Sequence, residues 1–387
     1  MKNKLTGLLF IAASLFMPLS AEVISSDIYG YSIDFPEGFS IADCSQDERS
    51  VLFEHTMVPV QTVIRVWPSD SGKSSADCLN STQKKISATG EVSPVRWRNQ
   101  DCCVSRISVP QNVLGQKMEG WAVCIPLPSQ TDYLCVISYC PEDKFYNLEQ
   151  FLLSVLDSIM IDRGSRREAG LITTFAFPKT TPQSITLNIA GQKIQTQIDK
   201  DDSQANQFVV DREFAVFKLF AETNMWKEAW QRFYRLIAKD AMGRVKKAAF
   251  DISAALFNST SDELTVAQAL LTWTQGFGYE RASATPDKAD FTNIPGVLAG
   301  LGSDCDSRSM LLMTLFKNMN MDSVMYISVE YSHAMAGLYL EGKQGQYFEL
   351  DGKKYLTGET TAKDLTWGMI SANMQDRSKW IPVELYD

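Results

Sequence analysis

The cysteines divide this chain of 387 residues into two parts. Seven of the eight lie in the first 140 residues, at positions 44, 78, 102, 103, 124, 135 and 140. The eighth, Cys305, stands alone in the remainder of the chain. A chain of this length has room for two or three domains of ~100–200 residues, each with its own hydrophobic core. The distribution therefore predicts two regions with different cysteine usage.

The first 21 residues have the pattern of a secretory signal peptide. Lys2 and Lys4 precede an apolar stretch over residues 5–19, and a small residue, Ala21, stands at the expected cleavage point. The apolar stretch is shorter than the ~20 residues that a bilayer span needs. An uncleaved anchor is the alternative. We expect an exported protein, periplasmic or secreted, with no stable membrane span after signal removal.

Clustered cysteines in an exported protein can form disulfides. Two predicted strands, Trp121–Pro126 and Asp132–Tyr139, flank a short turn, and this arrangement places Cys124 opposite Cys135. We predict a cross-strand disulfide between these two cysteines. The alternative is that both serve as small apolar residues of the core. Because seven is an odd number, at least one cysteine of this region stays free or pairs elsewhere.

Composition argues against several functions. The chain has 37 Lys and Arg residues against 46 Asp and Glu, a formal net charge of −9. Nucleic acid is therefore not an expected partner, because phosphate binding needs a basic face. Only two histidines occur, His55 and His333, so a histidine-based metal site is nearly excluded, and we expect neither a metal nor a cofactor. The sequence also lacks the full Walker-type pattern Gly-x-x-x-x-Gly-Lys-Ser/Thr of a phosphate-binding loop and a Gly-x-Ser-x-Gly elbow.

Residues 22–162 predict an α+β domain. Tyr29–Phe35 alternates apolar and polar residues, as a strand does, and residues 145–161 have one apolar helical face. An antiparallel sheet backed by helices is the expected architecture. Residues 31–39, with the helix over 153–159, resemble the PsbP-like domain family. This resemblance implies an accessory or binding role, with a protein as the possible partner of this domain.

The polar segment that begins at Asp162 predicts a linker over residues 163–175, followed by a second domain over residues 176–387. The informative stretch of that domain begins at Gly302, a turn residue. Ser303 fits a helix N-cap, with Asp306 three residues later as the capping-box acid. Cys305 then lies in the first helical turn, where unpaired backbone N–H groups and the positive end of the helix dipole favour a thiolate.

Three predicted strands follow this helix, over residues 323–331, 334–341 and 346–350. His333 stands at the start of the second strand, and Asp351 ends the third. With a turn centred near Gly342, His333 lies opposite or diagonal to Asp351. Cysteine at a helix start, with a histidine and a carboxylate on neighbouring strands, is an arrangement suited to nucleophilic catalysis.

The order of these residues resembles the transglutaminase-like cysteine protease superfamily. Four segments carry the resemblance: Gly302–Asp306, with Ser303 inserted in the family's Gly-Asp-Cys signature; the helix that ends at Gln275; the Pro-containing segment Ile294–Leu298; and the aromatic-rich strand before Asp351. It extends over about residues 180–367 and implies a papain-type α+β fold. It also implies the catalytic roles: Cys305 as nucleophile, His333 as base, Asp351 as the acid that holds the imidazole, and Gln275 as an oxyanion donor.

The expected function is acyl transfer or amide hydrolysis on a peptide or protein substrate, through a thioester on Cys305. A catalytically inactive binding or scaffold protein on the same fold is the alternative. A third possibility, a redox thiol at Cys305, lacks a second cysteine nearby in the sequence.

Overall fold

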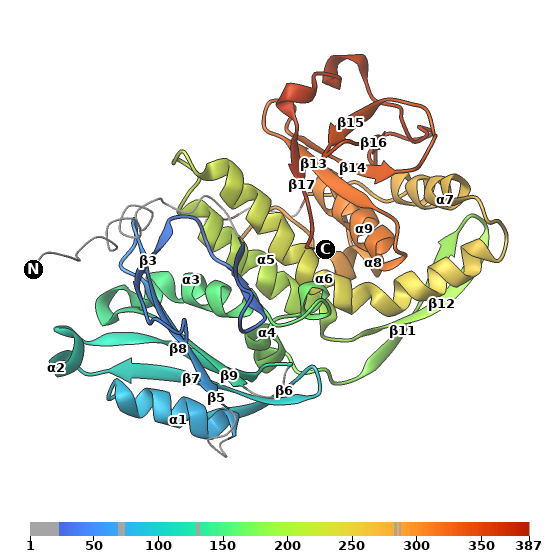
Figure 1. The fold of residues 1–387 in the computed structure, drawn as a ribbon. Helices are drawn as coiled ribbons and strands as arrows, with labels where there is room; N and C mark the ends of the chain where they lie inside the picture. Colours follow the sequence, from blue (N-terminus) through green and yellow to red (C-terminus); the bar gives the residue numbers. More distant parts are fainter. Residues whose placement is uncertain (1–22, 69–73, 129–131, 282–284, 286–287, 387) are drawn as a thin grey trace, which may run out of the picture. The chain divides into compact units, whose positions relative to one another are not determined.

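The computed structural model describes residues 23–68, 74–128, 132–281, 285 and 288–386 (Figure 1). The expected signal peptide, residues 1–21, lies outside the described residues. The chain divides into two compact units. Unit 1 comprises residues 1–165, 170–175 and 223–229, and unit 2 comprises residues 166–169, 176–222 and 230–387. In the described part of the chain, none of the helices combines the length and the apolar character that a membrane crossing requires.

Unit 1 is built on an antiparallel sheet of seven strands in the order β3-β4-β5-β9-β8-β7-β6. The strands are β3 (Phe39–Cys44), β4 (Ser50–His55), β5 (Gln61–Pro68), β6 (Ser93–Trp97), β7 (Gln100–Val109), β8 (Met118–Pro126) and β9 (Asp132–Pro141). A smaller antiparallel sheet joins β1 (Val23–Ser26), β2 (Tyr31–Asp34) and β10 (Ile159–Met160). The predicted hairpin is confirmed, because β8 pairs with β9 and Cys124 lies opposite Cys135.

Two helices cover the two faces of the large sheet (Figure 1). Helix α1 (Ser75–Lys85) packs on one face, where Leu79 joins a cluster that includes Ala122 and Cys124 of β8. Helix α3 (Phe145–Asp157) packs on the other face, where Glu149 accepts a hydrogen bond from the Trp121 indole at 3.0 Å. Successive residues of a strand point to opposite faces, so both helices find apolar partners on β8. A short helix, α2, spans Gln111–Leu114.

The segment expected as a linker, residues 163–175, is folded. It contains helix α4 (Leu171–Ala176), whose first three residues are buried. The backbone N–H of Thr173 donates to the Asp157 carboxylate at 3.0 Å, and the Thr173 hydroxyl also donates to this carboxylate. Residues 163–165 and 170–175 belong to unit 1, and residues 166–169 belong to unit 2.

Unit 2 combines helices with two antiparallel sheets. Its helices are α5 (Asp202–Lys218), α6 (Trp226–Phe257, which begins in unit 1), α7 (Glu263–Gln275), α8 (Ile294–Leu298) and α9 (Cys305–Asn318). The five-stranded sheet has the order β15-β16-β14-β13-β17, and β11 (Pro182–Ile189) pairs with β12 (Gln192–Asp199). The sheet strands are β13 (Ser323–Ser328), β14 (His333–Tyr339), β15 (Tyr347–Leu350), β16 (Lys353–Gly358) and β17 (Ile381–Val383). Both units are therefore mixed helix and antiparallel sheet, as the predicted α+β class requires.

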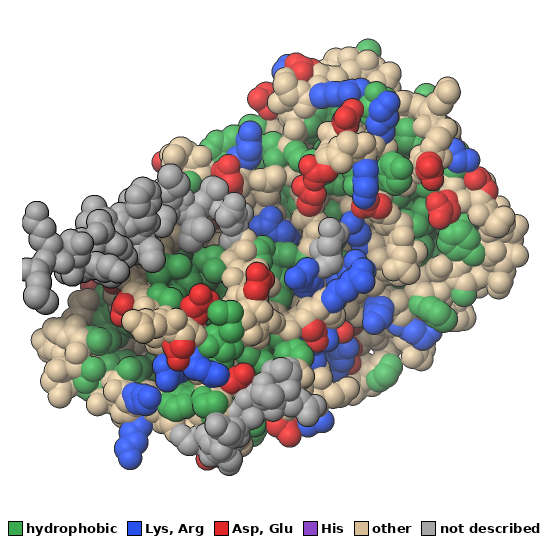
Figure 2. All heavy atoms as spheres, viewed as in Figure 1, with side chains coloured by type: hydrophobic (Ala, Val, Ile, Leu, Met, Phe, Trp, Pro, Cys, Tyr) green, Lys and Arg blue, Asp and Glu red, His purple; other side chains and the backbone are tan. Residues whose placement is uncertain are grey.

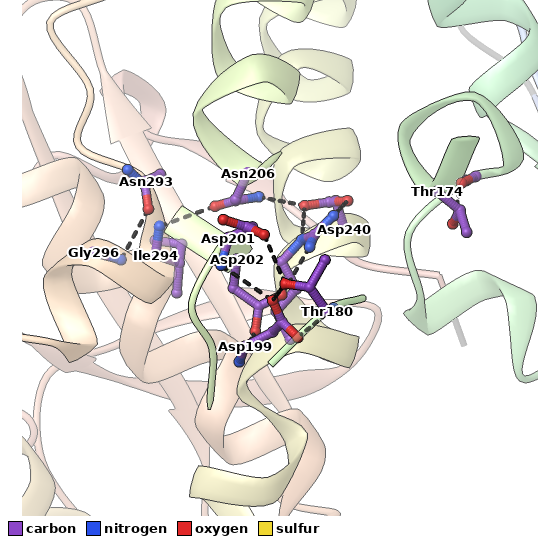
Figure 3. Close-up of polar contacts among 12 residues, drawn as sticks. Thr174, Thr180, Asp199, Asp201, Asp202, Asn206, Asp240, Asn293, Ile294 and Gly296 are labelled. Atoms are coloured by element: carbon purple, nitrogen blue, oxygen red, sulfur yellow. Dashed lines mark hydrogen bonds and ion pairs between the residues drawn. The ribbon is translucent and has the colours of Figure 1, made fainter. Parts of the chain in front are cut away.

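A buried polar network holds the helices that precede Cys305 (Figure 3). The Asn206 amide on α5 donates to Asp240 on α6 at 2.7 Å, and its oxygen accepts the backbone N–H of Ile294, the first residue of α8, at 3.0 Å. Arg244 on α6 binds Asp240 and Asp202 at 2.7 and 2.8 Å. Because buried charges require partners, this network restricts how α5, α6 and α8 can pack.

The surface carries charges of both signs. On the face drawn in Figure 2, Lys and Arg side chains lie among Asp and Glu side chains. The formal net charge of the whole sequence is −9.

Candidate active site

Cys305 lies in the first turn of helix α9, as the sequence predicts, but the N-cap is one residue further along than predicted. The N-cap is Asp304, whose carboxylate accepts the Ser307 N–H at 3.0 Å while the Ser307 hydroxyl accepts the Asp304 N–H at 3.0 Å. The predicted cap, Ser303, instead accepts a hydrogen bond from Arg308 Nε at 2.9 Å. Cys305 is thus the first helical residue, and only 1% of it is exposed.

Carboxylates surround the Cys305 thiol. The sulfur lies 3.1 Å from Asp306 Oδ1, to which the S–H donates, and the second oxygen of Asp306 accepts the hydroxyl of Tyr234. Burial, followed by the charge and hydrogen bond of Asp306 and the charge of Asp304, raises the pKa of Cys305. A hydrogen bond from the backbone N–H of Ala334 opposes this rise in part. The expectation that the helix start favours a thiolate is therefore wrong for this arrangement, because burial and the two carboxylates outweigh the helix dipole.

The same burial and negative charge shift the pKa values of Asp304 and Tyr234. Burial and the charge of Asp306 raise the pKa of Asp304 to about 6, although hydrogen bonds from Ser307 lower it in part. Burial and the same carboxylate also raise the pKa of Tyr234. The site therefore favours neutral forms of the tyrosine and the thiol at neutral pH.

His333 has a carboxylate partner that the sequence reasoning missed. Nε2 of the imidazole lies 2.7 Å from Oε2 of Glu359, and both side chains are largely buried. Burial raises the pKa of Glu359, but the hydrogen bond from His333 and those from Thr361 outweigh it and lower the pKa below its usual value. Strand β14 pairs with β16, with Ala336 opposite Gly358. Continuation of that register makes Glu359 a diagonal neighbour of His333.

Asp351 does not lie opposite His333, so the predicted pairing is wrong. Strand β15 pairs with β16, and β16 separates it from β14. Asp351 and Gly352 form the two-residue turn between β15 and β16, with φ values of 49° and 75°. Positive φ at both positions is typical of a type I′ turn, for which Asp-Gly is a preferred sequence. That dipeptide was the signal that could have placed the hairpin correctly.

Gln275 ends α7, and its side chain is buried. Its amide nitrogen donates to the backbone carbonyl oxygens of Glu359 and Leu365, at 2.9 and 3.0 Å. Both amide hydrogens are therefore engaged, and the geometry does not fit the implied role of oxyanion donor. Gln275 instead positions the segment that carries Glu359.

Arg308 is a second residue, after Gln275, that positions the segment next to Glu359, and the sequence did not predict this role. It lies on α9 and is 1% exposed. Its guanidinium donates to the carbonyl oxygen of Thr360 at 3.1 Å and to that of Phe277 at 3.0 Å. These bonds connect the first turns of α9 to the residue that follows Glu359. The single arginine of this helix, placed just before the apolar run Met310–Met313, was the available signal.

The known proteins found by comparison are only weakly similar to this chain. No protein-family model matches the sequence, and no curated protein matches it. Among solved structures, cyanobacterial PsbP (CyanoP) from Synechocystis sp. PCC 6803 is 13% identical, with a TM-score of 0.30, and the match covers 37% of this chain and 94% of that one. The Ran-binding protein Mog1p from Saccharomyces cerevisiae is 8% identical, with a TM-score of 0.28, over 36% of this chain and 94% of that one.

These likenesses concern the N-terminal part of the chain. They agree at a coarse level with the PsbP-like resemblance, and at such TM-scores they carry no argument about function. The comparisons give no support to a transglutaminase-like C-terminal half, which stays a prediction.

Proposed function

We propose that unit 2 catalyses acyl transfer through Cys305, with His333 as the base and Glu359 as the acid that orients it. One observation carries the proposal: helix α9, which begins at Cys305, packs against strand β14, which begins at His333, and the His333 imidazole is held by Glu359. In this proposal, nucleophile, base and orienting acid act together where α9 and β14 begin. This is the relationship that thiol catalysis needs.

The chemistry assigns one ring nitrogen to each task. Glu359 binds Nε2, and the proposal gives the second nitrogen, Nδ1, the task of taking the thiol proton. His333 takes the thiol proton as the sulfur attacks an acyl carbon, and the imidazolium then protonates the leaving group. A thioester on Cys305 remains, and water or an amine releases the acyl group. The backbone N–H of Cys305, at the first position of α9, is the oxyanion donor of this proposal.

Asp306 controls the resting state in this scheme. It accepts the thiol hydrogen and raises the pKa of Cys305, so the resting enzyme holds a neutral thiol. The S–H must turn from Asp306 to His333 before attack. The proposal includes a peptide or protein substrate, a transglutaminase-like papain-type fold and an exported location, which the sequence predicts.

A second candidate function is a binding or scaffold protein without catalysis. The burial of Cys305 and its raised pKa favour it, because thiols of this kind react slowly. On that alternative, Asp306, Tyr234 and Arg308 form a structural polar core.

The discriminating experiment measures acylation of Cys305 in the full chain. The protein is incubated with p-nitrophenyl acetate and digested with trypsin, and the acetylated fraction of fragment 289–308, which holds Cys305 as its one cysteine, is measured by mass spectrometry. Catalysis predicts that His333→Ala slows acetylation strongly while Asp351→Asn leaves it unchanged. Equal slow acetylation in all three proteins would overturn the proposal and support the scaffold function.

A further inference from the structure

Four cysteines of unit 1 converge in its core. Cys78 on α1, Cys103 on β7, Cys124 on β8 and Cys135 on β9 are each at most 2% exposed and belong to one apolar cluster. The sulfur atoms of Cys124 and Cys135 lie 2.9 Å apart. The Cys124 thiol also makes hydrogen-bond contacts with those of Cys103 and Cys78.

The hydrogen-bond pattern of the β8–β9 ladder distinguishes among the possible pairs. The N–H of Leu127 donates to the Asp132 carbonyl at 2.9 Å, and the N–H of Glu142 donates to the Lys117 carbonyl at 3.1 Å. Both are directly opposed pairs of the register that places Cys124 opposite Cys135. Hydrogen-bonded and non-hydrogen-bonded pairs alternate along an antiparallel ladder. The Leu127–Asp132 and Lys117–Glu142 pairs are both hydrogen-bonded, and alternation from either of them makes Cys124 and Cys135 a non-hydrogen-bonded pair.

The same alternation shows which kind of pair Cys124 forms with Cys103, its neighbour on β7. Its N–H and C=O face β7, so Cys103 and Cys124, which are opposite each other, form a hydrogen-bonded pair. The N–H of Ser108 on β7 donates to Thr89, away from β8, which agrees with this assignment. Cα atoms are ~4.5 Å apart in non-hydrogen-bonded pairs and ~5.5 Å apart in hydrogen-bonded pairs, and the side chains are closer in the first kind. Cys124 is therefore better placed to bond with Cys135 than with Cys103.

Helix α1 supplies a partner for Cys103. The Ser75 hydroxyl donates to the backbone carbonyl of Asp101 at 2.5 Å, and the Gln83 amide donates to the Ser105 hydroxyl at 2.8 Å. The helix thus follows β7 over these residues. Cys78 lies between the two contacts on the buried side of α1, and Cys103 lies between them on β7. Cys78 and Cys103 therefore lie within the same stretch of the α1–β7 contact, and Cys103 is the thiol left for Cys78 once Cys124 is paired with Cys135.

We propose that unit 1 carries two disulfides, Cys124–Cys135 and Cys78–Cys103. Each forms by exchange with an external disulfide, such as oxidised glutathione. One protein thiolate attacks the external disulfide and releases a thiol; the second protein thiolate then attacks the mixed disulfide and releases the other thiol. The two protein thiols are oxidised, their two protons pass to solvent or to the released thiolates, and the external disulfide is reduced. Because the four thiols are buried, exchange precedes closure of the core.

Strand spacing disfavours a single metal ion bound to all four sulfurs. Cys103 and Cys135 are separated by β8, two strand spacings or ~9.6 Å in the sheet. Thiolates that bind one tetrahedral zinc lie within ~4 Å of each other, since each zinc–sulfur bond is ~2.3 Å. The described residues include no group of three or more His, Cys, Asp or Glu side chains arranged to hold a metal ion.

The test maps disulfides in the full chain. A Cys102→Ser, Cys140→Ser double variant is used so that each relevant fragment keeps one cysteine; strand alternation places both substituted residues on the opposite face of the sheet. The chain is refolded with oxidised and reduced glutathione, its free thiols are blocked, and it is digested without reduction by trypsin and a protease that cleaves before Asp. We expect fragment 118–131 joined to 132–142, and fragment 77–84 joined to 101–106.

Other outcomes overturn the assignment. A link between fragments 101–106 and 118–131 would show that Cys103 pairs with Cys124. Full alkylation of all four thiols would show that no bond forms. Zinc retained after dialysis, with thiols that a chelator exposes to alkylation, would show a metal centre. None of these results bears on acylation of Cys305, so this proposal and the proposed function fail independently.

Discussion

Unit 1 and unit 2 both bury thiols, but they surround them with different groups. Cys124 lies among apolar side chains and other thiols, and burial followed by those sulfur contacts raises its pKa. Cys305 is buried beside Asp306 and Asp304, at the start of a helix and next to a backbone N–H. The comparison teaches that exposure does not distinguish a structural thiol from a candidate nucleophile. The neighbouring groups decide what a buried thiol can do.

The two histidines repeat this contrast. His55 in unit 1 packs edge-on against the rings of Phe39 and Phe151, and burial lowers its pKa to about 4 against an opposing hydrogen bond with the backbone of Glu37. His333 in unit 2 binds a carboxylate, Glu359. A neutral imidazole suits an apolar core, whereas an imidazole beside a carboxylate can accept a proton during a reaction.

The largest expected effect is on acylation of Cys305. His333→Ala should slow acetylation of fragment 289–308 by ~10²–10⁴-fold, because the base no longer takes the thiol proton. The matched control is His55→Gln, which removes the other histidine of the chain and should leave the rate unchanged. Equal effects of the two substitutions would mean that the contrast between the histidines has no catalytic meaning.

The next effect is on the stability of unit 1. Cys135→Ser should lower the free energy of unfolding of the oxidised chain by about 3 kcal/mol, because closure of this short loop restricts the unfolded chain. Chemical denaturation monitored by fluorescence measures the difference. The same substitution should have a much smaller effect on the fully reduced chain. A similar loss under both conditions would point to packing rather than to a disulfide.

Glu359 and Asp351 provide a direct test of the corrected strand register. Glu359→Gln should slow acetylation of Cys305 by about thirtyfold, equivalent to about 2 kcal/mol for a hydrogen bond to a charged group. Asp351→Asn should have no effect, because Asp351 lies in the exposed β15–β16 turn. If Asp351→Asn slowed acetylation more than Glu359→Gln, the pairing of His333 with Asp351 that the sequence predicts would be restored.

The burial of His55 predicts a pH dependence of stability. Its pKa of about 4 in the folded chain is below the ~6.5 of an exposed histidine, so the unfolded chain binds a proton between these values that the folded chain does not. Stability therefore falls as the pH falls through this window, by about 2 kcal/mol between pH 7 and pH 5. Denaturation of the wild-type chain and His55→Gln across this range measures the contribution. An identical slope in both would remove His55 as its source.

The smallest effect concerns the resting thiol. Asp306→Asn removes the carboxylate whose charge and hydrogen bond raise the pKa of Cys305, so this pKa should fall. The thiolate fraction rises about tenfold for each unit of pKa, and alkylation by iodoacetamide at neutral pH should accelerate about tenfold. Asp351→Asn is the charge-matched control. A slower reaction in Asp306→Asn would show that Asp306 activates the thiol rather than holding its proton.

Local patterns predicted the elements that depend on neighbours in sequence. Alternating residues around a short turn located the β8–β9 hairpin and placed Cys124 opposite Cys135. The capping pattern located the start of α9 to within one residue, which put Cys305 in its first turn. Both succeed because turn and cap preferences act over a few residues.

The partner of His333 depended on a choice between strands that are distant in sequence. The Asp351-Gly352 turn pairs β15 with β16, and β16 rather than β15 then lies beside β14. A single hairpin assigned differently therefore changes the acid from Asp351 to Glu359. The contacts of Arg308 and Gln275 with the Glu359 segment also join residues separated by 52 to 90 positions.

The sequence by itself determined that Cys305 lies in the first turn of a helix, that His333 begins a strand and that Cys124 and Cys135 share a hairpin. Tertiary structure alone decided which carboxylate binds His333, that cysteines of α1 and β7 join those of the β8–β9 hairpin in one core cluster, and that Asp306 and Tyr234 contact the group around the Cys305 thiol. The physical reason is the distance along the chain over which each interaction acts. Turns and caps are set by backbone preferences within a few residues, whereas strand order, burial and pKa depend on which distant surfaces pack together.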